Sequence, residues 1–378
     1  MLLIGDLEYG GAQRQVIELA NHLDPAHFEA HVCSLSDYIP LSPQLRHMDD
    51  RIHILKKACR FDVTVVPRLA RLLRTLRIHI LHSFLFDADI AARLAGRLAG
   101  TPVIINSERN TDYPLKLRHL AAYRLTKGCV DLIIANSAAG AEYNRSKLGH
   151  SPAQYRVVYN GVNTDRFVPG DGTAIRSALG IRPDEYLVGL FSSYKPQKNH
   201  PVFFAAARRV LDRIPRTRFL IVGDVLHGGV DGSADYKARM DRIVDMLGIR
   251  HRCVFLGNRD DVDHLYRACD LTVLCSLFEG TPNVILESMA CGVPVIVTDV
   301  ADNAHIVPHG RVGYDIAVND DTALAECICT LLLDEPQRRR MGCAARDWVV
   351  REFSVTQLAR DTQDVYLEAL HRKREHSQ

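Results

Sequence analysis

The chain has 378 residues, which is too long for one ordinary hydrophobic core and predicts two domains with a cleft between them. Lys and Arg total 47 against 45 Asp and Glu, and this formal charge of +2 argues against a dedicated nucleic-acid binder. The 10 cysteines lack the paired spacing of zinc ligands or a disulfide framework, and no apolar run reaches the roughly 20 residues of a membrane span. The amino terminus does not resemble a secretory signal, so we expect a cytoplasmic protein.

The first part of the chain alternates short apolar runs with helical stretches. Residues 1–4 predict a strand, a turn follows at Gly10 and Gly11, and the apolar spacing after the turn predicts a helix. Further buried strands are predicted at 32–35, 78–81, 103–105 and 132–135. Such alternation is typical of a parallel sheet with helices on both faces. We therefore predict a doubly wound α/β domain over residues 1–165.

The pattern is interrupted by a segment rich in Asn, Gly, Asp and Pro, and we predict a linker over residues 166–184. The alternation then restarts, with strands expected at 186–191, 219–222, 254–256, 271–275 and 293–297. These strands predict a second doubly wound domain over 185–352. The remaining residues, 353–378, predict a helix that packs back on the first domain and ends in a frayed, charged tail.

The segment from Phe278 to Glu287 is the strongest candidate for a binding site. It follows a predicted strand, and open α/β sheets bind ligands beyond the carboxyl ends of their strands. Thr281 is a good N-cap and Pro282 suits the first helical position, so a helix start with free N–H groups is predicted there. The positive end of such a helix favours an anion. Glu279 and Glu287 flank this helix start; by themselves they would suggest only a loop carboxylate and a solvated helix residue.

The same segment, FEGTPNVILESMACGVPVI at 278–296, resembles the signature of glycosyltransferase family 4, whose members are retaining enzymes with the GT-B fold. The resemblance implies an α/β protein with two Rossmann-like domains that face a central cleft. It further implies that Glu279 faces the transferred sugar and that Glu287 binds the ribose of the sugar donor. The other residues it implies for the donor pocket here are Gly280, Thr281, Pro282 and Asn283.

The resemblance extends over nearly the whole chain. Gly10 and Gly11 match a Gly-Gly turn whose backbone N–H groups approach the donor phosphates and the acceptor, and glycine there also permits positive φ. Residues 159–167 resemble the family's hinge, and 221–224 resemble a strand that leads into the second domain's binding edge. Lys198 occupies the position of a diphosphate-binding Lys, and cations before a helix are unfavourable unless an anion is present.

Two positions depart from the family pattern. An Arg is usual five residues before the diphosphate-binding Lys, but Ser193 stands there, and Lys195 would have to supply the charge without the bidentate geometry of an Arg. A His is common after the strand at 103–105, where either Glu108 or Arg109 would have to take over its contact. His82 is another candidate, although a lone His at a strand end is more often structural. The catalytic candidates are thus Glu279, Lys198, Glu108 and His82.

No metal site and no cofactor are predicted. The triplets Asp87-Ala88-Asp89 and Asp261-Val262-Asp263 each open an apparent helix, where capping and the helix dipole explain the acids. The charge on a departing diphosphate would then be met by Lys198, helix N-termini and backbone N–H groups.

We therefore predict transfer of a hexose or N-acetylhexosamine from a nucleoside diphosphate sugar to a glycan or lipid-linked acceptor, in surface-polysaccharide or glycoconjugate biosynthesis. Retention of anomeric configuration is implied by the resemblance. The sugar donor is expected mainly on the second domain, and the acceptor near Gly10, Gly11, His82 and Glu108. Basic stretches at 56–57, 68–77 and 116–119 are compatible with peripheral contact at the inner face of the membrane, although such runs are usually solvated.

Three alternatives remain open at this point. A nucleotide-sugar 2-epimerase could share the two-domain architecture, and a non-catalytic nucleotide-sugar-binding protein could have lost the Arg now replaced by Ser193. A dinucleotide oxidoreductase is remote, because no Gly-X-Gly-X-X-Gly follows the first predicted strand.

Overall fold

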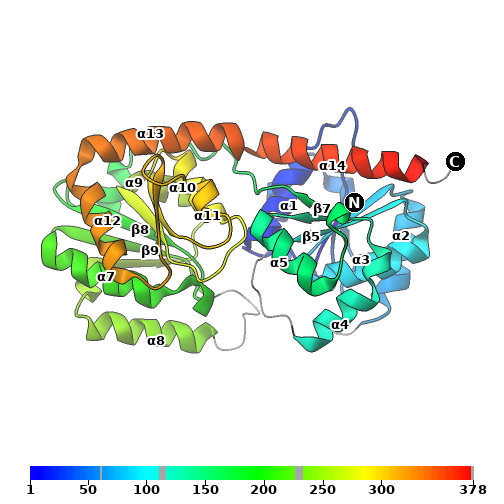
Figure 1. Cartoon of the computed structure of the whole chain (residues 1–378), viewed down its shortest axis with the longest axis horizontal. Helices are drawn as coiled ribbons and strands as arrows, with labels where there is room; N and C mark the ends of the chain where they lie inside the picture. Colours follow the sequence, from blue (N-terminus) through cyan, green and yellow to red (C-terminus); the bar gives the residue numbers. More distant parts are fainter. Residues whose placement is uncertain (60–61, 110–115, 226–232, 376–378) are drawn as a thin grey trace. The chain divides into compact units, whose positions relative to one another are not determined.

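The computed structural model describes residues 1–59, 62–109, 116–225 and 233–375. The chain divides into two compact units. The first unit comprises Met1–Gly161 and Val355–Gln378, and the second comprises Val162–Ser354. Each unit is built on a parallel sheet with helices packed on it (Figure 1). The prediction of two Rossmann-like α/β domains is confirmed.

In the first unit, the described residues form a parallel sheet in the order β3-β2-β1-β4-β5-β6-β7. Its strands are β1 (Leu2–Ile4), β2 (Val32–Ser34), β3 (Ile52–Ile54), β4 (Ile80–Phe84), β5 (Val103–Glu108), β6 (Leu132–Ala135) and β7 (Tyr155–Val157). Its α-helices are α1 (Gly11–His22), α2 (Val65–Thr75), α3 (Phe86–Ala99), α4 (Leu117–Leu125), α5 (Ala138–Leu148) and α14 (Val355–Glu375). Short 3₁₀ turns are η1 (Ser42–Gln44), η2 (Asp49–Arg51), η3 (Lys127–Cys129) and η4 (Pro152–Gln154).

Strand β1 shows why the predicted strands are apolar along their whole length. Leu2 and Ile4 pack with residues of α1 and α14, whereas Met1 and Leu3 pack with residues of α2 and α3. Successive side chains of a strand point to opposite faces, so a sheet covered on both faces needs apolar residues at every position.

In the second unit, the described residues form a parallel sheet in the order β10-β9-β8-β11-β12-β13. Its strands are β8 (Tyr186–Phe191), β9 (Thr217–Val222), β10 (Cys253–Gly257), β11 (Leu271–Leu274), β12 (Val295–Thr298) and β13 (Gly313–Ile316). Its α-helices are α6 (Thr173–Ala178), α7 (His200–Arg213), α8 (Ser233–Met246), α9 (Val262–Ala268), α10 (Asn283–Ala290), α11 (Asn303–Ile306), α12 (Asp321–Leu333) and α13 (Glu335–Glu352). Its 3₁₀ turns are η5 (Pro196–Lys198) and η6 (Arg250–Arg252).

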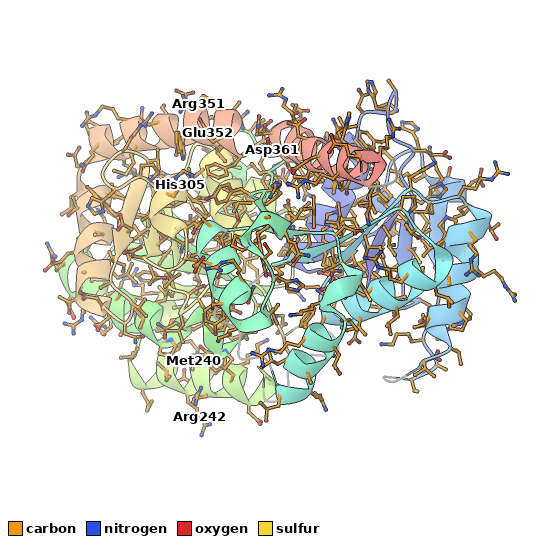
Figure 2. All side chains as sticks on the ribbon, turned by 45° about the vertical axis from the view of Figure 1, so that its right-hand side comes forward. Met240, Arg242, His305, Arg351, Glu352 and Asp361 are labelled. Carbon is orange, nitrogen blue, oxygen red and sulfur yellow. The ribbon has the colours of Figure 1, made fainter. Side chains whose placement is uncertain are left out.

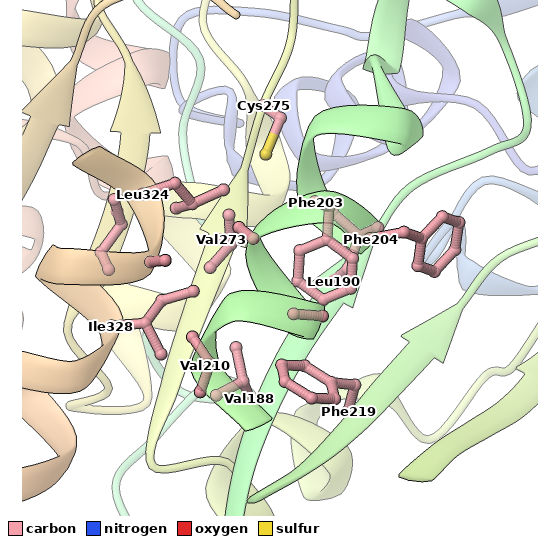
Figure 3. Close-up of a cluster of buried hydrophobic side chains, with 14 of the residues drawn as sticks. Val188, Leu190, Phe203, Phe204, Val210, Phe219, Val273, Cys275, Leu324 and Ile328 are labelled. Atoms are coloured by element: carbon pink, nitrogen blue, oxygen red, sulfur yellow. The ribbon is translucent and has the colours of Figure 1, made fainter. Parts of the chain in front are cut away.

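A large buried cluster of the second unit lies between its sheet and helices α7, α8 and α12. Figure 3 shows part of this cluster, with Leu190 of β8 beside Phe203 of α7 and Val188 of β8 beside Val210 of α7. The rings of Phe203 and Phe219 meet edge to face, with their centroids 5.8 Å apart. Because these side chains are fully buried and interlocked, β8 and α7 are held together, and with them the loop that joins them.

Helix α8 illustrates how the outer helices face the sheet. Met240 is 1% exposed and belongs to the buried cluster, whereas Arg242, two residues later, is exposed; Figure 2 labels both side chains. Residues two apart lie on different sides of an α-helix, so one side packs on the core and the other meets water.

The segment 166–184, expected to be a linker, lies within the second unit, and the chain passes between the units at Gly161 and again at Val355. Residues 173–178 form α6, and the Arg176 guanidinium lies 3.3 Å from a carboxylate oxygen of Asp270. The Gly- and Pro-rich composition therefore reflects a folded surface segment rather than a free connection.

Helix α14 belongs to the first unit, where it packs against α1. The expected frayed tail begins at His371, but helix continues to Glu375, and Lys373 Nζ lies 2.7 Å from Asp131 Oδ1. The charged side chains near the helix end thus include one that is paired with the first unit. Residues 376–378 of the predicted tail lie outside the described part of the chain.

Candidate active site

The order of the second sheet reverses between β8 and β11, which are adjacent and parallel. Loops at the carboxyl ends of strands on either side of such a reversal diverge and leave room for a ligand. The two loops are joined directly here. Gln197 Nε2 donates to the carbonyl oxygen of Phe278 at 2.7 Å, and Leu277 N donates to the carbonyl oxygen of Gln197 at 2.8 Å.

Lys198 and Glu279 meet at this place. Lys198 is the last residue of η5, and its Nζ lies 2.5 Å from Glu279 Oε1, with the two side chains 18% and 8% exposed. Ser276 Oγ also donates to Glu279 Oε1, at 2.5 Å. Within the described residues, both hydrogen bonds of this carboxylate go to Oε1, so Oε2 is left to accept one from a ligand. The sequence predicts this lysine and this acid as site residues, but it does not point to Ser276.

Helix α10 begins at Asn283 with Pro282 as its N-cap, so the predicted start, with Thr281 as the cap, lies one residue too early. Pro282 has no side-chain oxygen to accept a hydrogen bond from the first turn, in contrast to the usual Ser, Thr, Asp or Asn cap. Gly280, Thr281 and Pro282 are all buried next to Glu279. This helix start is therefore suited to a ligand anion.

Glu287 lies one turn along α10 and is only 6% exposed, so the alternative of a solvated helix residue is wrong. Its Oε2 accepts a hydrogen bond of 2.9 Å from the hydroxyl of Tyr266, on α9. The Tyr266 ring stacks on Phe191, the last residue of β8, with centroids 4.0 Å apart. Glu287 is thereby held beside the carboxyl end of β8. Nothing in the sequence signals Tyr266, which only the fold brings to this carboxylate.

Ser193 and Lys195 lie on the loop after β8 that also carries Lys198, and both are partly exposed. The carbonyl oxygen of Lys195 accepts the backbone N–H of Lys198 at 2.9 Å. Gly223, after β9, has φ +132, and a Cβ there would lie 2.2 Å from the carbonyl oxygen of Ser192. Glycine thus lets the exit of β9 pack against the backbone of this loop. The roles of Ser193 and Lys195 in donor binding remain predictions.

In the first unit, Gly10 is the N-cap of α1 and Gly11 its first residue, but Gly10 has φ −119 and neither glycine has a positive φ. The conformational reason given for them is therefore wrong. A Cβ at Gly10 would instead lie 2.1 Å from Gln13 Oε1, and Gln13 Nε2 donates to Asp6 Oδ1 at 2.8 Å. A larger residue at position 10 would therefore displace the amide end of Gln13, and contact of Gly10 and Gly11 with a sugar donor remains a prediction.

The structure also corrects the expectation for His82. It lies within β4 rather than after a strand, and it is 1% exposed. Its Nδ1 lies 2.7 Å from the hydroxyl of Tyr366 on α14, and its Nε2 lies 2.8 Å from Ser107 Oγ on β5. Burial, reinforced by the charge of Arg109, lowers the pKa of His82 well below its usual value. These contacts describe a structural histidine that ties α14 to the sheet.

Glu108 is the last residue of β5, and its Oε1 accepts a hydrogen bond of 3.1 Å from the hydroxyl of Tyr155. In the part of the chain that the structure describes, Glu108 Oε2 and Arg109 Nε are buried without a hydrogen-bond partner. Burial raises the pKa of Glu108 to about 7, which suits a group that exchanges protons near neutrality. Its contact with a substrate remains a prediction.

Asp89 does not have the capping role given to its triplet. It is 1% exposed and accepts hydrogen bonds from Ser83 Oγ at 2.7 Å and from the Tyr123 hydroxyl at 2.8 Å. Burial raises the pKa of Asp89 to about 6. Asp263, from the other triplet, lies 3.5 Å from the guanidinium of Arg267. Across the described ranges, no three His, Cys, Asp or Glu side chains gather as a metal site would require.

Two Rossmann-like domains, one of which carries a lysine, a carboxylate and a helix start where its strand order reverses, form the architecture of glycosyltransferases of the GT-B class. The chain matches the family model described as "Glycosyl transferases group 1" over residues 171–348. It also matches the one described as "Glycosyltransferase Family 4" over residues 9–166. The chain belongs to glycosyltransferase family 4.

Curated relatives are glycosyltransferases. The chain is 26% identical over 344 residues to the UDP-Gal:alpha-D-GlcNAc-diphosphoundecaprenol alpha-1,3-galactosyltransferase of Escherichia coli, with 86% of each chain covered. It is 26% identical over 317 residues to the N-acetyl-alpha-D-glucosaminyl L-malate synthase of Bacillus anthracis, with 82% of this chain and 80% of the relative covered. The chain is thus an enzyme of the glycosyltransferase type.

A solved structure with the same fold is HepE of Anabaena in complex with UDP, with a TM-score of 0.82 and 22% identity over 97% of this chain and 99% of that one. WaaG, a glycosyltransferase involved in lipopolysaccharide biosynthesis, has a TM-score of 0.73 at 15% identity, with 97% of this chain and 99% of that one covered. At these identities the likeness establishes the fold. In the ranges described here, no helix has both the length and the hydropathy needed to cross a membrane.

Proposed function

We propose that the enzyme transfers a hexose or N-acetylhexosamine from a nucleoside diphosphate sugar to a hydroxyl group of a glycan or lipid-linked acceptor, with retention of anomeric configuration. The Lys198–Glu279 pair beside the start of α10 carries the proposal. An ammonium group and a helix N-terminus suit a diphosphate, and a carboxylate oxygen suits the hydroxyls of a sugar. The names of the Escherichia coli and Anabaena proteins, which specify UDP-Gal and UDP, support a uridine nucleotide.

The sugar donor binds to the second unit in this proposal. Lys198 and the first backbone N–H groups of α10 hold the diphosphate, and Glu279 Oε2 accepts a hydrogen bond from the transferred sugar. Glu287, fixed by Tyr266, accepts hydrogen bonds from the ribose. Ser193 and Lys195 lie on the loop that carries Lys198, where the ammonium of Lys195 adds to the positive charge available to the diphosphate.

The chemical step that we favour uses no enzymic nucleophile. The bond between the anomeric carbon and the diphosphate oxygen breaks, while a bond forms on the same face between that carbon and the acceptor oxygen. The acceptor proton passes to an oxygen of the departing phosphate. Lys198 and the α10 N–H groups stabilise the negative charge that develops on this leaving group.

The positive charge of this step comes from the protein, so we propose that the reaction needs no metal ion. Turnover is expected to be the same after dialysis against EDTA as before it, when the initial rate of nucleoside diphosphate release is measured. Loss of turnover that returns with added Mg²⁺ or Mn²⁺ would contradict this part of the proposal.

We also propose that helix α4 of the first unit docks on an anionic phospholipid surface, which would place the enzyme at the inner face of the cytoplasmic membrane. Leu117 and Leu125, at the two ends of α4, are 85% and 87% exposed. Residues 116–130 contain four Lys or Arg residues and no acid. Although α4 lacks the strong amphipathicity of most interfacial helices, its exposed leucines and flanking cations offer apolar and electrostatic contacts to an anionic membrane surface. The basic pair at 56–57 fits less well, because Lys56 and Lys57 form ion pairs with Asp37 and Asp87.

Sedimentation with vesicles tests this docking surface. The enzyme with both Leu117→Ser and Leu125→Ser is expected to lose binding to vesicles that contain phosphatidylglycerol. Met246→Ser, which removes a 78% exposed side chain from α8 of the second unit, is the matched control and should bind normally. Equal binding by both variants would contradict the proposed surface.

A thermal-shift screen against a panel of nucleotide sugars, followed by incubation of the best ligand with lipid-linked acceptors, tests the proposed activity. The expected result is stabilisation by one class of donor and a glycosylated acceptor identified by mass spectrometry. Release of epimerised nucleotide sugar without any acceptor would identify an epimerase instead. Binding that is followed by neither transfer nor slow hydrolysis would identify a non-catalytic binding protein.

A further inference from the structure

Behind Glu279 lies a series of polar side chains that the proposed donor site does not use. Ser276 follows β11 and is fully buried, and its Oγ donates the 2.5 Å hydrogen bond to Glu279 Oε1. The carbonyl oxygen of Ser276 accepts a hydrogen bond of 2.6 Å from Thr298 Oγ1, at the end of β12. Because β11 and β12 are paired strands, this bond anchors the Glu279 loop to its neighbour in the sheet.

Asn303 extends the series from the first residue of α11. Its Nδ2 donates to the carbonyl oxygen of Thr298 at 2.9 Å, and the residue is 1% exposed. Its Oδ1 is buried and has no hydrogen-bond partner among the described residues. A buried amide oxygen without a partner lowers the stability of the folded state. We infer that the hydrogen bond from Asn303 Nδ2, which holds the backbone of Thr298 in place, offsets this loss of stability.

The two contacts of Glu279 Oε1 differ in how easily they can be exchanged. Lys198 carries its ammonium on a long, partly exposed side chain, whereas Ser276 is rigidly buried at a strand end. A diphosphate carries more negative charge than one carboxylate, so a bound nucleotide sugar would draw the ammonium toward itself. Ser276 would then be the contact that still holds the carboxylate.

We infer that Ser276, supported by Thr298 and Asn303, is a positioning residue that holds Glu279 Oε1 and keeps Oε2 available to the transferred sugar while Lys198 binds the diphosphate. The inference rests on the proposed function. Two residues then have different roles at this site. Lys198 stabilises charge on the leaving group, and Ser276 fixes the carboxylate that orients the sugar.

Steady-state kinetics of Ser276→Ala test the inference, together with calorimetric titration of the nucleoside diphosphate alone. We expect kcat to fall about 10- to 100-fold, the range for a lost hydrogen bond to a charged group. The KM for the sugar donor and the affinity for the nucleoside diphosphate should not change, because Lys198 and Glu287 are intact. Ser276→Thr retains the hydroxyl and is expected to restore most of kcat.

Ser288→Ala is the matched control. Ser288 is also fully buried in the second unit, and its hydroxyl lies 2.7 Å from Thr272 Oγ1, away from Glu279. This variant should lose as much thermal stability as Ser276→Ala and retain the wild-type kcat.

The inference is overturned if Ser276→Ala retains the wild-type kcat, if Ser288→Ala loses as much turnover, or if a folded Ser276→Thr enzyme stays as slow as Ser276→Ala. The proposed function itself is rejected by a different result, which concerns the wild-type enzyme alone. That result is the absence of sugar transfer from every donor in the panel.

Discussion

The two units share a doubly wound parallel sheet but use their polar side chains differently. In the second unit, Lys198 and Glu279 lie where the strand order reverses, and both hydrogen bonds that the described residues make to the Glu279 carboxylate go to Oε1. In the first unit, His82 and Asp89 point into the interior and make their hydrogen bonds with the protein itself. The same sheet architecture therefore carries a candidate ligand site in one unit and internal polar networks in the other.

The position of a polar residue relative to the end of its strand decides whether it can contact a ligand. A residue after the last strand position, such as Glu279, can turn toward a ligand, whereas one within the strand, such as His82, is enclosed by the covering helices. Replacement of Lys198 or Glu279 should therefore impair activity more than stability, and replacement of His82 should show the reverse.

Replacement of Lys198 should give the largest effect. Lys198→Met removes the cation proposed to meet the diphosphate, and we expect kcat to fall by about two to three orders of magnitude with little change in melting temperature. The initial rate of nucleoside diphosphate release measures the effect. Arg209→Met, which removes an exposed ion pair with Asp321 in the same unit, is the control and should keep its rate. Normal turnover by Lys198→Met would refute the site.

Loss of His82 is expected to cost stability instead. His82→Ala leaves a cavity and removes the partners of the Tyr366 hydroxyl and Ser107 Oγ, which predicts a loss of about 3 kcal/mol of unfolding free energy. Urea unfolding measures this loss, and the affinity for a nucleoside diphosphate should not change. His27→Ala, at an exposed position in the first unit, should have little effect on either quantity. A stable His82→Ala enzyme without turnover would restore His82 as a catalytic candidate.

Glu108, in the first unit, should make the stability of the protein depend on pH. Its pKa is about 7 in the folded protein against 4.5 ordinarily, so between these values the folded protein holds a proton that the unfolded chain has released. Stability must then fall as pH rises through this window, by about 3 to 4 kcal/mol. Glu108→Gln has no carboxyl group to titrate. Its free energy of unfolding should therefore rise relative to that of the wild type as pH increases from 4.5 to 8. Urea unfolding at several pH values measures the difference, and parallel stability curves would contradict the buried carboxyl group.

Replacement of Tyr266 should give the smallest effect. Tyr266→Phe keeps the ring stacked on Phe191 but removes the hydrogen bond to Glu287, so we expect nucleoside diphosphate affinity to fall about 3- to 10-fold. Isothermal titration calorimetry measures this change. Tyr236→Phe is the matched control, because that buried hydroxyl accepts the backbone N–H of His200, away from Glu287. Equal affinity in all three proteins would show that Glu287 needs no such support.

The sequence predicted the strands that form continuous apolar runs, including the partly buried edge strand β10, but missed β3, β7 and β13. Each of these lies at an edge of its sheet or includes partly exposed positions, so it lacks a continuous apolar run. The start of α10 was placed one residue early, because Thr281 and Pro282 suit both a cap and a first turn. Such boundaries depend on backbone geometry that local preferences specify only approximately.

By itself, the sequence determined the alternation of strands and helices and the family motif that contains Glu279 and Glu287, because both are written in residues close together along the chain. The tertiary structure decided which distant groups meet those carboxylates. Ser276 is three residues from Glu279, but Thr298 and Tyr266 reach the site from a neighbouring strand and another helix. It also decided that His82 is buried, since α14, formed by the last part of the chain, covers the strand on which His82 lies. Contacts between distant segments depend on how the sheet pairs and packs, and local residue patterns do not carry that information.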